Sequence, residues 1–140
     1  MAQKKTIHLQ IVTPSKNPVE MDADMFLVQT NGAQIAILPY HMSMLANVDI
    51  SVLTVVIDGQ ESHYAVGGGA LHVDSETDSA TLLVPSIVAA KDITIEQARE
   101  REALARQKLE RAASNEEHRE AQRELLRALN VVDVSQNFKI

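Results

Sequence analysis

The stretch that decides the fold is YAVGGGALHV at residues 64–73, in which three consecutive glycines stand between two apolar runs. A glycine-rich loop can bind phosphate when it leads into a helix N-terminus and, in the P-loop, carries a Lys. Here strand-like residues flank the glycines, and the chain contains neither Gly-Lys-Ser/Thr nor a GxGxxG pattern. We therefore expect Gly67, Gly68 and Gly69 to bend a strand or to let another backbone approach closely.

The residues around this stretch, 6–84, form short apolar runs separated by turn signals. The first run, TIHLQIV at 6–12, alternates apolar residues in the way that is typical of a strand with one buried face. Asn31-Gly32 and Asp58-Gly59 stand between strand-like runs and are strong hairpin signals. Because no long helical pattern interrupts the runs, parallel βαβ units are excluded, and we expect an antiparallel β-sandwich of about 8–10 strands.

The pattern changes after Pro85. Residues 94–112 read TIEQAREREALARQKLERA, and Thr94 with Gln97 fits a capping box at the start of a helix. A second helix is expected over 115–130, and the short linker between the two permits only an antiparallel pair. The sequence therefore predicts a β-sandwich domain over 1–88 and a helical hairpin domain over 89–140.

The apolar seam of this hairpin is thin and rich in alanine. Its expected members are Ile95, Ala98, Glu102, Ala105, Leu109 and Ala112 on the first helix and His118, Ala121, Leu125, Ala128 and Val132 on the second. A buried Ala in place of Leu removes about 2–4 kcal/mol of core stabilisation. We expect the hairpin to depend on the β domain or a partner, and to be a candidate moving part.

Composition excludes several classes of protein. The net charge of −6 argues against nucleic acid and anionic lipid as partners. The chain has no Cys, no apolar run of about 18 residues and no secretory signal pattern, so we expect a soluble, cytoplasmic protein. Every Arg lies after position 98, either as a solvated helix surface or as a row of donors for an acidic partner or a phosphate. These are Arg99, Arg101, Arg106, Arg111, Arg119, Arg123 and Arg127.

No motif indicates an enzyme or a metal site. His63 and His72 fall in adjacent predicted strands, but no HxH, HExxH or GxSxG pattern occurs. The acids of the β half cluster at turns, without the spacing of a calcium loop. We expect these polar residues to be solvated and the metal sites to be absent.

Four motifs in order carry a resemblance to a known family. They are LQIVTP at 9–14, GAQIAILPYHMSML at 32–45, AVGGGALHV at 65–73 and KDIT at 91–94. In this order they resemble the epsilon subunit of bacterial F-type ATP synthases, whose fold the mitochondrial delta subunit shares. Departures are Ala36, where the family has a glycine, and Ala70, where it has an aromatic residue.

The resemblance implies a non-catalytic rotor subunit whose sandwich clamps the gamma subunit and sits on the c-ring, coupling ion flow to ATP synthesis. It implies a peripheral protein on the cytoplasmic side of the cell membrane. The residues it suggests for binding gamma and the c-ring are Leu38, Pro39, His41, Leu45, Gly68 and Gly69.

By the same resemblance, the hairpin is an arm that extends to the catalytic alpha and beta subunits and inhibits ATP hydrolysis. Its expected donors are Arg99, Arg106, Arg111, Arg119, Arg123 and Arg127. A stand-alone β-sandwich adaptor for a small ligand or peptide, with the hairpin as a lid, is the alternative.

Some members of this family bind ATP through Ile/Leu-Asp-x-x-Arg-Ala, which aligns with residues 93–98. The matching positions are Ile93, Thr94, Gln97 and Ala98, so Thr replaces the Asp and Gln replaces the Arg. Loss of a carboxylate and a guanidinium removes the obvious polar contacts to nucleotide. We expect no cofactor and poor ATP binding, although Arg99 or Arg127 could compensate.

Overall fold

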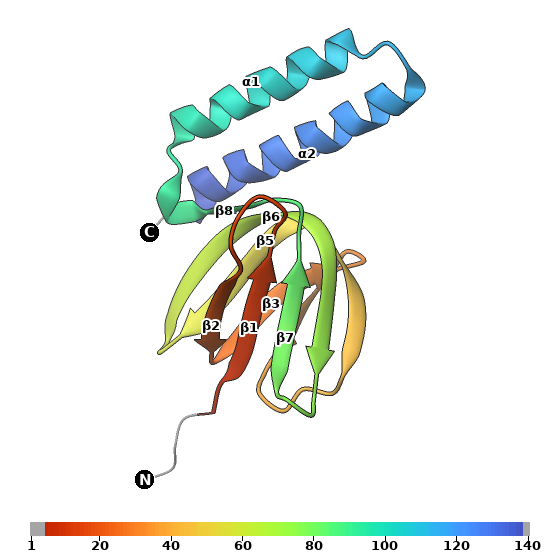
Figure 1. Ribbon diagram of the computed structural model, residues 1–140. Helices are drawn as coiled ribbons and strands as arrows, with labels where there is room; N and C mark the ends of the chain where they lie inside the picture. Colours follow the sequence, from red (N-terminus) through yellow and green to blue (C-terminus); the bar gives the residue numbers. More distant parts are fainter. Residues whose placement is uncertain (1–4, 139–140) are drawn as a thin grey trace.

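Residues 5–138, which the computed structural model describes, form a β-sandwich of eight strands and a C-terminal pair of helices (Figure 1). The strands are β1 Ile7–Val12, β2 Val19–Ala23, β3 Met25–Thr30, β4 Ala33–Ile37, β5 Met44–Ile57, β6 Gln60–Asp74, β7 Ser79–Leu83 and β8 Ile87–Ala89. A 3-10 turn, η1 (Ala90–Asp92), leads to the helices α1 (Ile95–Arg111) and α2 (Asn115–Asn137).

The strands pair in the order β2-β1-β7-β6-β5-β3-β4, and β8 pairs with β6. The neighbours run antiparallel as expected, apart from β1 and β7, which run parallel with Leu9 opposite Ala80. A parallel pair cannot be closed by a tight turn. It forms here between strands that lie far apart in the chain.

Two long strands, β5 and β6, connect the two layers of the sandwich. Their register is continuous from Met44 opposite Val73 to Ile57 opposite Gln60. The turn between them has positive φ at Asp58 and Gly59, as an Asp-Gly hairpin requires. The sequence predicted several shorter strands here, so the expectation that His63 and His72 lie on adjacent strands is wrong: both belong to β6.

The three glycines bend β6 where it passes from one layer to the other. Gly68 and Gly69 have φ of 86° and 137°, a conformation that L side chains rarely adopt. A Cβ at Gly69 would lie 2.0 Å from the carbonyl oxygen of Leu83. The glycines therefore bend the strand and admit a close backbone neighbour, as the sequence predicted.

The core lies between the two layers and is built from large side chains. Phe26, Leu53 and Leu71 are completely buried in it, together with Ile, Leu and Val residues of β1, β3, β4 and β7. Alternation of buried and less buried residues along β1 and β3 places one face of each strand in this core.

The hairpin begins as the sequence predicts. The Thr94 hydroxyl accepts a hydrogen bond from the backbone N–H of Gln97 (3.2 Å), and the Gln97 side chain accepts one from the backbone N–H of Thr94 (3.0 Å). Ser114 caps α2 by accepting from the N–H of Glu117 at 3.1 Å. Helix α2 continues to Asn137 rather than ending near 130, because its last turns bury valines against the sandwich.

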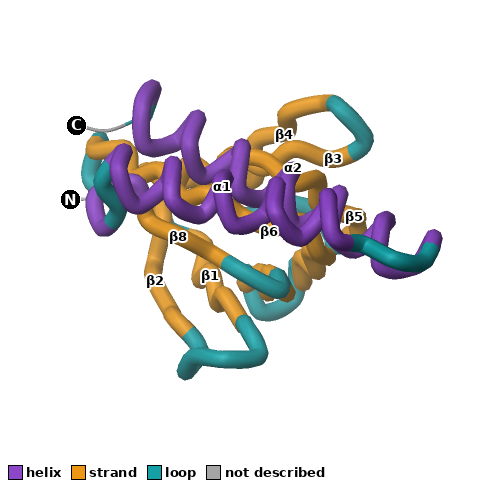
Figure 2. The backbone as a smooth tube through the Cα atoms, turned by 90° about the horizontal axis from the view of Figure 1, so that it is seen from above, coloured by secondary structure: helices purple, strands orange, loops and turns teal. Residues whose placement is uncertain are grey.

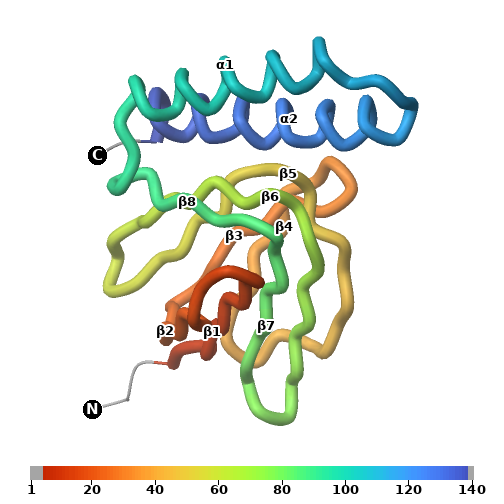
Figure 3. The backbone as a smooth tube through the Cα atoms, turned by 45° about the horizontal axis from the view of Figure 1, so that its top comes forward, coloured from red at the N-terminus to blue at the C-terminus, as the bar shows by residue number. Residues whose placement is uncertain are grey.

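The alanine seam is largely confirmed. Ala98, Ala105, Ala121, Ala128 and Val132 are buried, whereas Ile95 and His118 are exposed and were wrongly assigned to it. Figures 2 and 3 show α2 between α1 and the sandwich, crossing β5, β6 and β8. Over residues 5–138, neither helix has the length and apolar character needed to cross a bilayer.

Candidate functional site

The helical hairpin is attached to the sandwich by a small hydrophobic cluster that is separate from the core. We call this group the docking cluster; it consists of Ala65, Ala90, Ile93, Ala98, Val131, Val132 and Val134, with Val52, Val88 and Phe138 packed against it. Apart from Ile93 its buried members are Ala and Val, which contribute little area each. The attachment therefore buries little apolar surface per residue.

Two polar side chains of α2 add direct contacts to the sandwich backbone. The Arg127 Nε–H donates to the carbonyl oxygen of Gly67 at 3.0 Å. The Asn130 side-chain amide donates to the carbonyl of Ser51 at 2.7 Å and more weakly to that of Val66 at 3.4 Å. All three acceptors lie on β5 and β6 beside the glycine bend, so α2 is oriented over this bend.

A tilted contact between two rings lies at the C-terminal end of the attachment. The rings of Phe138 and His63 lie 4.9 Å apart between centroids. His63 in turn contacts the Thr54 hydroxyl through Nδ1 at 3.0 Å. The His63 side chain, expected to be an ordinary polar strand residue, thus lies under the end of α2.

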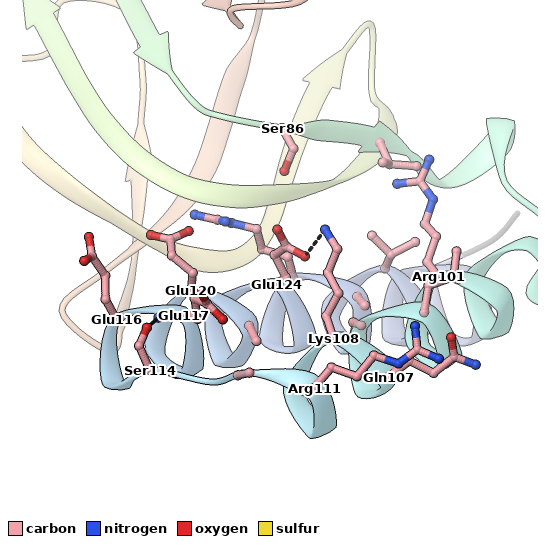
Figure 4. Close-up of a pocket in the computed structure, with 18 residues that line it drawn as sticks. Ser86, Arg101, Gln107, Lys108, Arg111, Ser114, Glu116, Glu117, Glu120 and Glu124 are labelled. Atoms are coloured by element: carbon pink, nitrogen blue, oxygen red, sulfur yellow. Dashed lines mark hydrogen bonds and ion pairs between the residues drawn. The ribbon is translucent and has the colours of Figure 1, made fainter.

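A groove of about 990 Å³ runs between the two helices and the strand segment at Ser86 and Val88 (Figure 4). Its charged lining is balanced: four bases (Arg101, Lys108, Arg111, Arg127) and four acids (Glu116, Glu117, Glu120, Glu124). Lys108 and Glu124 form an ion pair across the helices at 3.0 Å. The lining therefore carries no net positive charge that would attract an anion.

The arginines expected to form one row of donors have different surroundings. Arg99 and Arg106 both pair with Glu102, at 3.0 and 2.9 Å. The Arg106 and Arg99 guanidinium groups hold the pKa of the Glu102 carboxyl below its ordinary value. Arg123 lies 3.6 Å from Glu120 and Arg111 lines the groove, whereas Arg119 is exposed. The partly buried Arg127 points to the sandwich instead of the solvent.

The positions of the degenerate nucleotide motif serve the helix itself. Ile93 and Ala98 are buried in the docking cluster. The side chains of Thr94 and Gln97 bind each other's backbone in the capping box described above. A second cavity of about 310 Å³ includes Gln97 together with Asp92, Glu100 and Arg101, two acids and one base.

An exposed apolar loop lies at the end of the sandwich opposite the hairpin. Leu38, Tyr40, Met42 and Leu45 are 48%, 68%, 74% and 79% exposed. We call residues 38–45 the apolar loop. Pro39 and His41 are half-buried within it, and the backbone N–H of Tyr40 donates to Asp78 Oδ1 at 2.8 Å, which ties the loop to the turn before β7.

The six residues suggested for partner binding fall into two places. Leu38, Pro39, His41 and Leu45 belong to the apolar loop, whereas Gly68 and Gly69 form the bend of β6. Leu45 pairs with His72, three residues along β6 from Gly69. Tyr40 and Met42 are exposed in the same loop but were not among the residues suggested, because neither matches the motif. Arg127 was expected as an arm donor or as a substitute contact to ATP, and Asn130 was not expected at all.

The sequence of this chain is similar to curated proteins of one kind. Residues 6–90 match the family model described as ATP synthase, Delta/Epsilon chain, beta-sandwich domain. The ATP synthase epsilon chain of Bacillus velezensis is 32% identical over 133 residues, covering 95% of this chain and 99% of that protein. The chloroplastic ATP synthase epsilon chain of Pinus thunbergii is 33% identical over 123 residues, 88% of each chain.

The fold is also found in solved structures. A chain in the structure of Euglena gracilis mitochondrial ATP synthase, comprising OSCP, F1 and c-ring, aligns with a TM-score of 0.70 at 17% identity, covering 90% of this chain and 79% of that one. A chain of the Tetrahymena thermophila mitochondrial ATP synthase central stalk and c-ring aligns with a TM-score of 0.61 at 12% identity, covering 96% and 100%. These likenesses concern the fold. Sandwich, helical pair and the matches in sequence together place the chain in one family: it belongs to the ATP synthase epsilon chains.

Proposed function

We propose that this chain is a non-catalytic subunit of the central stalk of an ATP synthase, with the hairpin as a releasable regulatory arm. The sandwich binds the gamma subunit and the c-ring and turns with them, which couples ion flow to ATP synthesis. The protein is then peripheral, on the cytoplasmic side of the cell membrane. Epsilon-chain relatives support the role, and the solved structures that share the fold are of ATP synthase assemblies with a c-ring, one of them with the central stalk.

The observation that carries the regulatory role is the separation of the docking cluster from the core. The core holds Phe26, Leu53 and Leu71, while α2 is held by alanines, valines and the hydrogen bonds of two side chains. An element with few buried apolar contacts opens at lower free energy than the rest of a protein. The hairpin is thus able to leave the sandwich while the sandwich remains folded.

The released arm contacts the catalytic alpha and beta subunits through its arginines. In the docked form Arg99 and Arg106 are paired with Glu102, and Arg127 binds Gly67. Arg111, Arg119 and Arg123 are exposed on the helix surface and can meet an acidic partner at little cost.

Deleting residues 91–140 tests the regulatory role. The assembled complex that carries the truncated chain should hydrolyse ATP faster, because the inhibitory arm is gone, while assembly is retained. The family model matches residues 6–90, which the truncation keeps. Equal hydrolysis rates with full-length and truncated chains under all nucleotide conditions would show that the arm is not an inhibitor.

Substitutions in the apolar loop test whether the sandwich binds the gamma subunit and the c-ring. A soluble protein rarely exposes several large apolar side chains together without a partner for them. With purified gamma and c-ring, we expect the full chain to co-elute in size exclusion, and Met42→Ser with Leu45→Ser to weaken this association. Leu126→Ser, at an exposed position of α2, is the matched control. A stand-alone lidded adaptor would not co-elute with these subunits at all.

The degenerate motif leads us to propose weak ATP binding. Support comes from Thr94 and Gln97, whose polar groups are occupied by the capping box. Titration calorimetry with ATP should give weak or no binding. A double variant, Thr94→Asp with Gln97→Arg, should bind more tightly, because Asp also caps helices and Arg adds a guanidinium. Tight binding to the unaltered chain would contradict the proposal.

A further inference from the structure

Helix α2 meets the glycine bend of β6 through hydrogen bonds to main-chain carbonyls. Arg127 binds the carbonyl of Gly67, and Asn130 bridges the opposed residues Ser51 and Val66. These contacts join residues 60 to 79 positions apart in the chain, so they form only when the hairpin is docked.

The bend makes these carbonyls accessible. Pairing of β6 with β7 ends at Ala70 opposite Leu83, and pairing with β8 resumes at Val66 opposite Ile87. Between them the Gly67 N–H still donates to the Ser86 carbonyl at 3.0 Å. Because the ladder is interrupted here, the Gly67 carbonyl can accept a hydrogen bond from the Arg127 side chain. A hydrogen bond from a charged donor such as a guanidinium is stronger than one from a neutral donor.

The glycine at position 67 leaves room for two side chains that converge on it, Ser86 and Arg127. A Cβ there would lie 2.3 Å from Ser86 Oγ and 3.1 Å from Arg127 Nε. Gly67 lacks the positive φ of Gly68 and Gly69, so an alanine would not strain the backbone. The absence of a side chain is therefore required first by Ser86 and then by Arg127, whose side chains converge on this position.

Arg127 has no carboxylate partner within 4.0 Å among residues 5–138, unlike Arg99, Arg106 and Arg123. Its charge is partly buried against the sandwich and is stabilised there by the Gly67 carbonyl. When α2 leaves, this carbonyl and the guanidinium can both be hydrated, so the contact is reversible.

We infer that Arg127 and Asn130 form a latch on the carbonyls beside the Gly67 bend, which holds the arm down without a bound nucleotide. We call these two side chains the carbonyl latch. The regulatory consequence rests on the proposed function, whereas the latch itself is a property of the isolated chain. Of the three glycines, Gly67 then serves as the acceptor for an arginine of the same chain.

Hydrogen exchange on the full-length isolated chain tests the latch. Arg127→Met keeps the side-chain length and helix propensity but removes the donor. The amides of α2 should exchange about tenfold faster, because a hydrogen bond to a charged group is lost. Arg123→Met, one helical turn earlier and exposed, is the matched control and should leave exchange unchanged.

Gly67→Ala and Asn130→Ala provide independent variants. Both should accelerate exchange of α2, while amides of β1 and β3 keep their protection and report that the sandwich is folded. Equal exchange of α2 in Arg127→Met, Gly67→Ala and Arg123→Met would overturn the latch.

A second readout separates the latch from the proposed function. In the assembled complex, Gly67→Ala, which disturbs the latch and leaves every arginine of the arm in place, should lower ATP hydrolysis, because more arms are released. Faster exchange with unchanged hydrolysis would keep the latch and contradict the inhibitory arm. Unchanged exchange, together with higher hydrolysis on deletion of 91–140, would overturn the latch and keep the arm.

Discussion

The core of the sandwich and the docking cluster are two apolar regions built from different residues. The core buries Phe26, Leu53 and Leu71 completely, and each such side chain contributes roughly 1.5–3 kcal/mol. The docking cluster contains Ala65, Ala98 and valines of α2, with a smaller apolar surface per residue. The difference supports the proposal that a stable base carries an element able to separate from it.

The polar contacts within the sandwich are also more extensive than those that hold the hairpin on it. The strands share long ladders, such as the thirteen residue pairs of β5 and β6, which skip only the position of Asp49 and Gly68. The hairpin reaches the sandwich through the carbonyl latch and the ring contact of Phe138 with His63. Substitutions in the two regions should therefore change different equilibria.

Phe26→Ala should have the largest effect. Removing a fully buried aromatic ring from a packed core costs about 3–5 kcal/mol, since a cavity remains. We expect the whole chain to lose this free energy of unfolding, measured by urea denaturation followed by circular dichroism. A loss confined to the helical signal would contradict the assignment of Phe26 to the stable region.

Gly69→Ala tests whether the stability of the sandwich depends on the glycine bend of β6. A Cβ would clash with the Leu83 carbonyl at a φ of 137°, so the sandwich should be destabilised by about 1–3 kcal/mol. Gly67→Ala, two residues earlier without positive φ, is the matched control and should affect mainly the docking of α2. If both variants lost sandwich stability equally, the two glycines would not have the different roles assigned to them, Gly69 in the bend and Gly67 in the docking of α2.

Val134→Ala tests the docking cluster itself. Val134 is completely buried, and loss of its two methyl groups should weaken docking by about 1–2 kcal/mol. Amides of α2 should exchange faster, while the urea midpoint of the sandwich stays nearly unchanged. Leu126→Ala, at an exposed position on the same helix, should change neither.

The smallest expected effect comes from a surface cluster at the sandwich edge. His8 on β1 contacts Asp22 at 2.9 Å and Glu20 at 3.1 Å on β2. The Asp22 and Glu20 carboxylates raise the pKa of the His8 imidazole. Its stabilising contribution is therefore complete below the ordinary His pKa and is lost as pH rises through the raised value.

His8→Gln should reveal this contribution as a pH-dependent difference from the unaltered chain. Because the group is exposed, we expect only about 0.2–1 kcal/mol at pH 5.5 and almost none at pH 9. The measurement is the urea midpoint of both proteins at the two pH values. A difference that grows with pH would contradict the assigned sign.

Local signals in the sequence were sufficient for the fold. Asn31-Gly32 and Asp58-Gly59 formed the expected hairpins, and Thr94 with Gln97 formed the expected capping box. These features depend on residues within a few positions of each other. The parallel pairing of β1 with β7 depends on contacts far apart in the chain, which no local pattern specifies.

The docking of α2 was harder to predict for the same reason. Val131, Val132 and Val134 are poor helix formers, and the expected helix ended before them. Burial against β6 and η1 outweighs that propensity. From the sequence alone, Arg127 cannot be distinguished from the other arginines of the helices. Only the fold shows that the bend of β6 places the Gly67 carbonyl beside it.

The central claim is that the hairpin separates from a sandwich that remains folded. Native-state hydrogen exchange of the unaltered full-length chain, followed with increasing urea, measures this directly. We predict that amides of α2 exchange through an opening of smaller free energy and weaker urea dependence than those of β1, β3 and β5. A single isotherm shared by helices and strands would contradict the account, because the arm would then be released only when the whole chain unfolds.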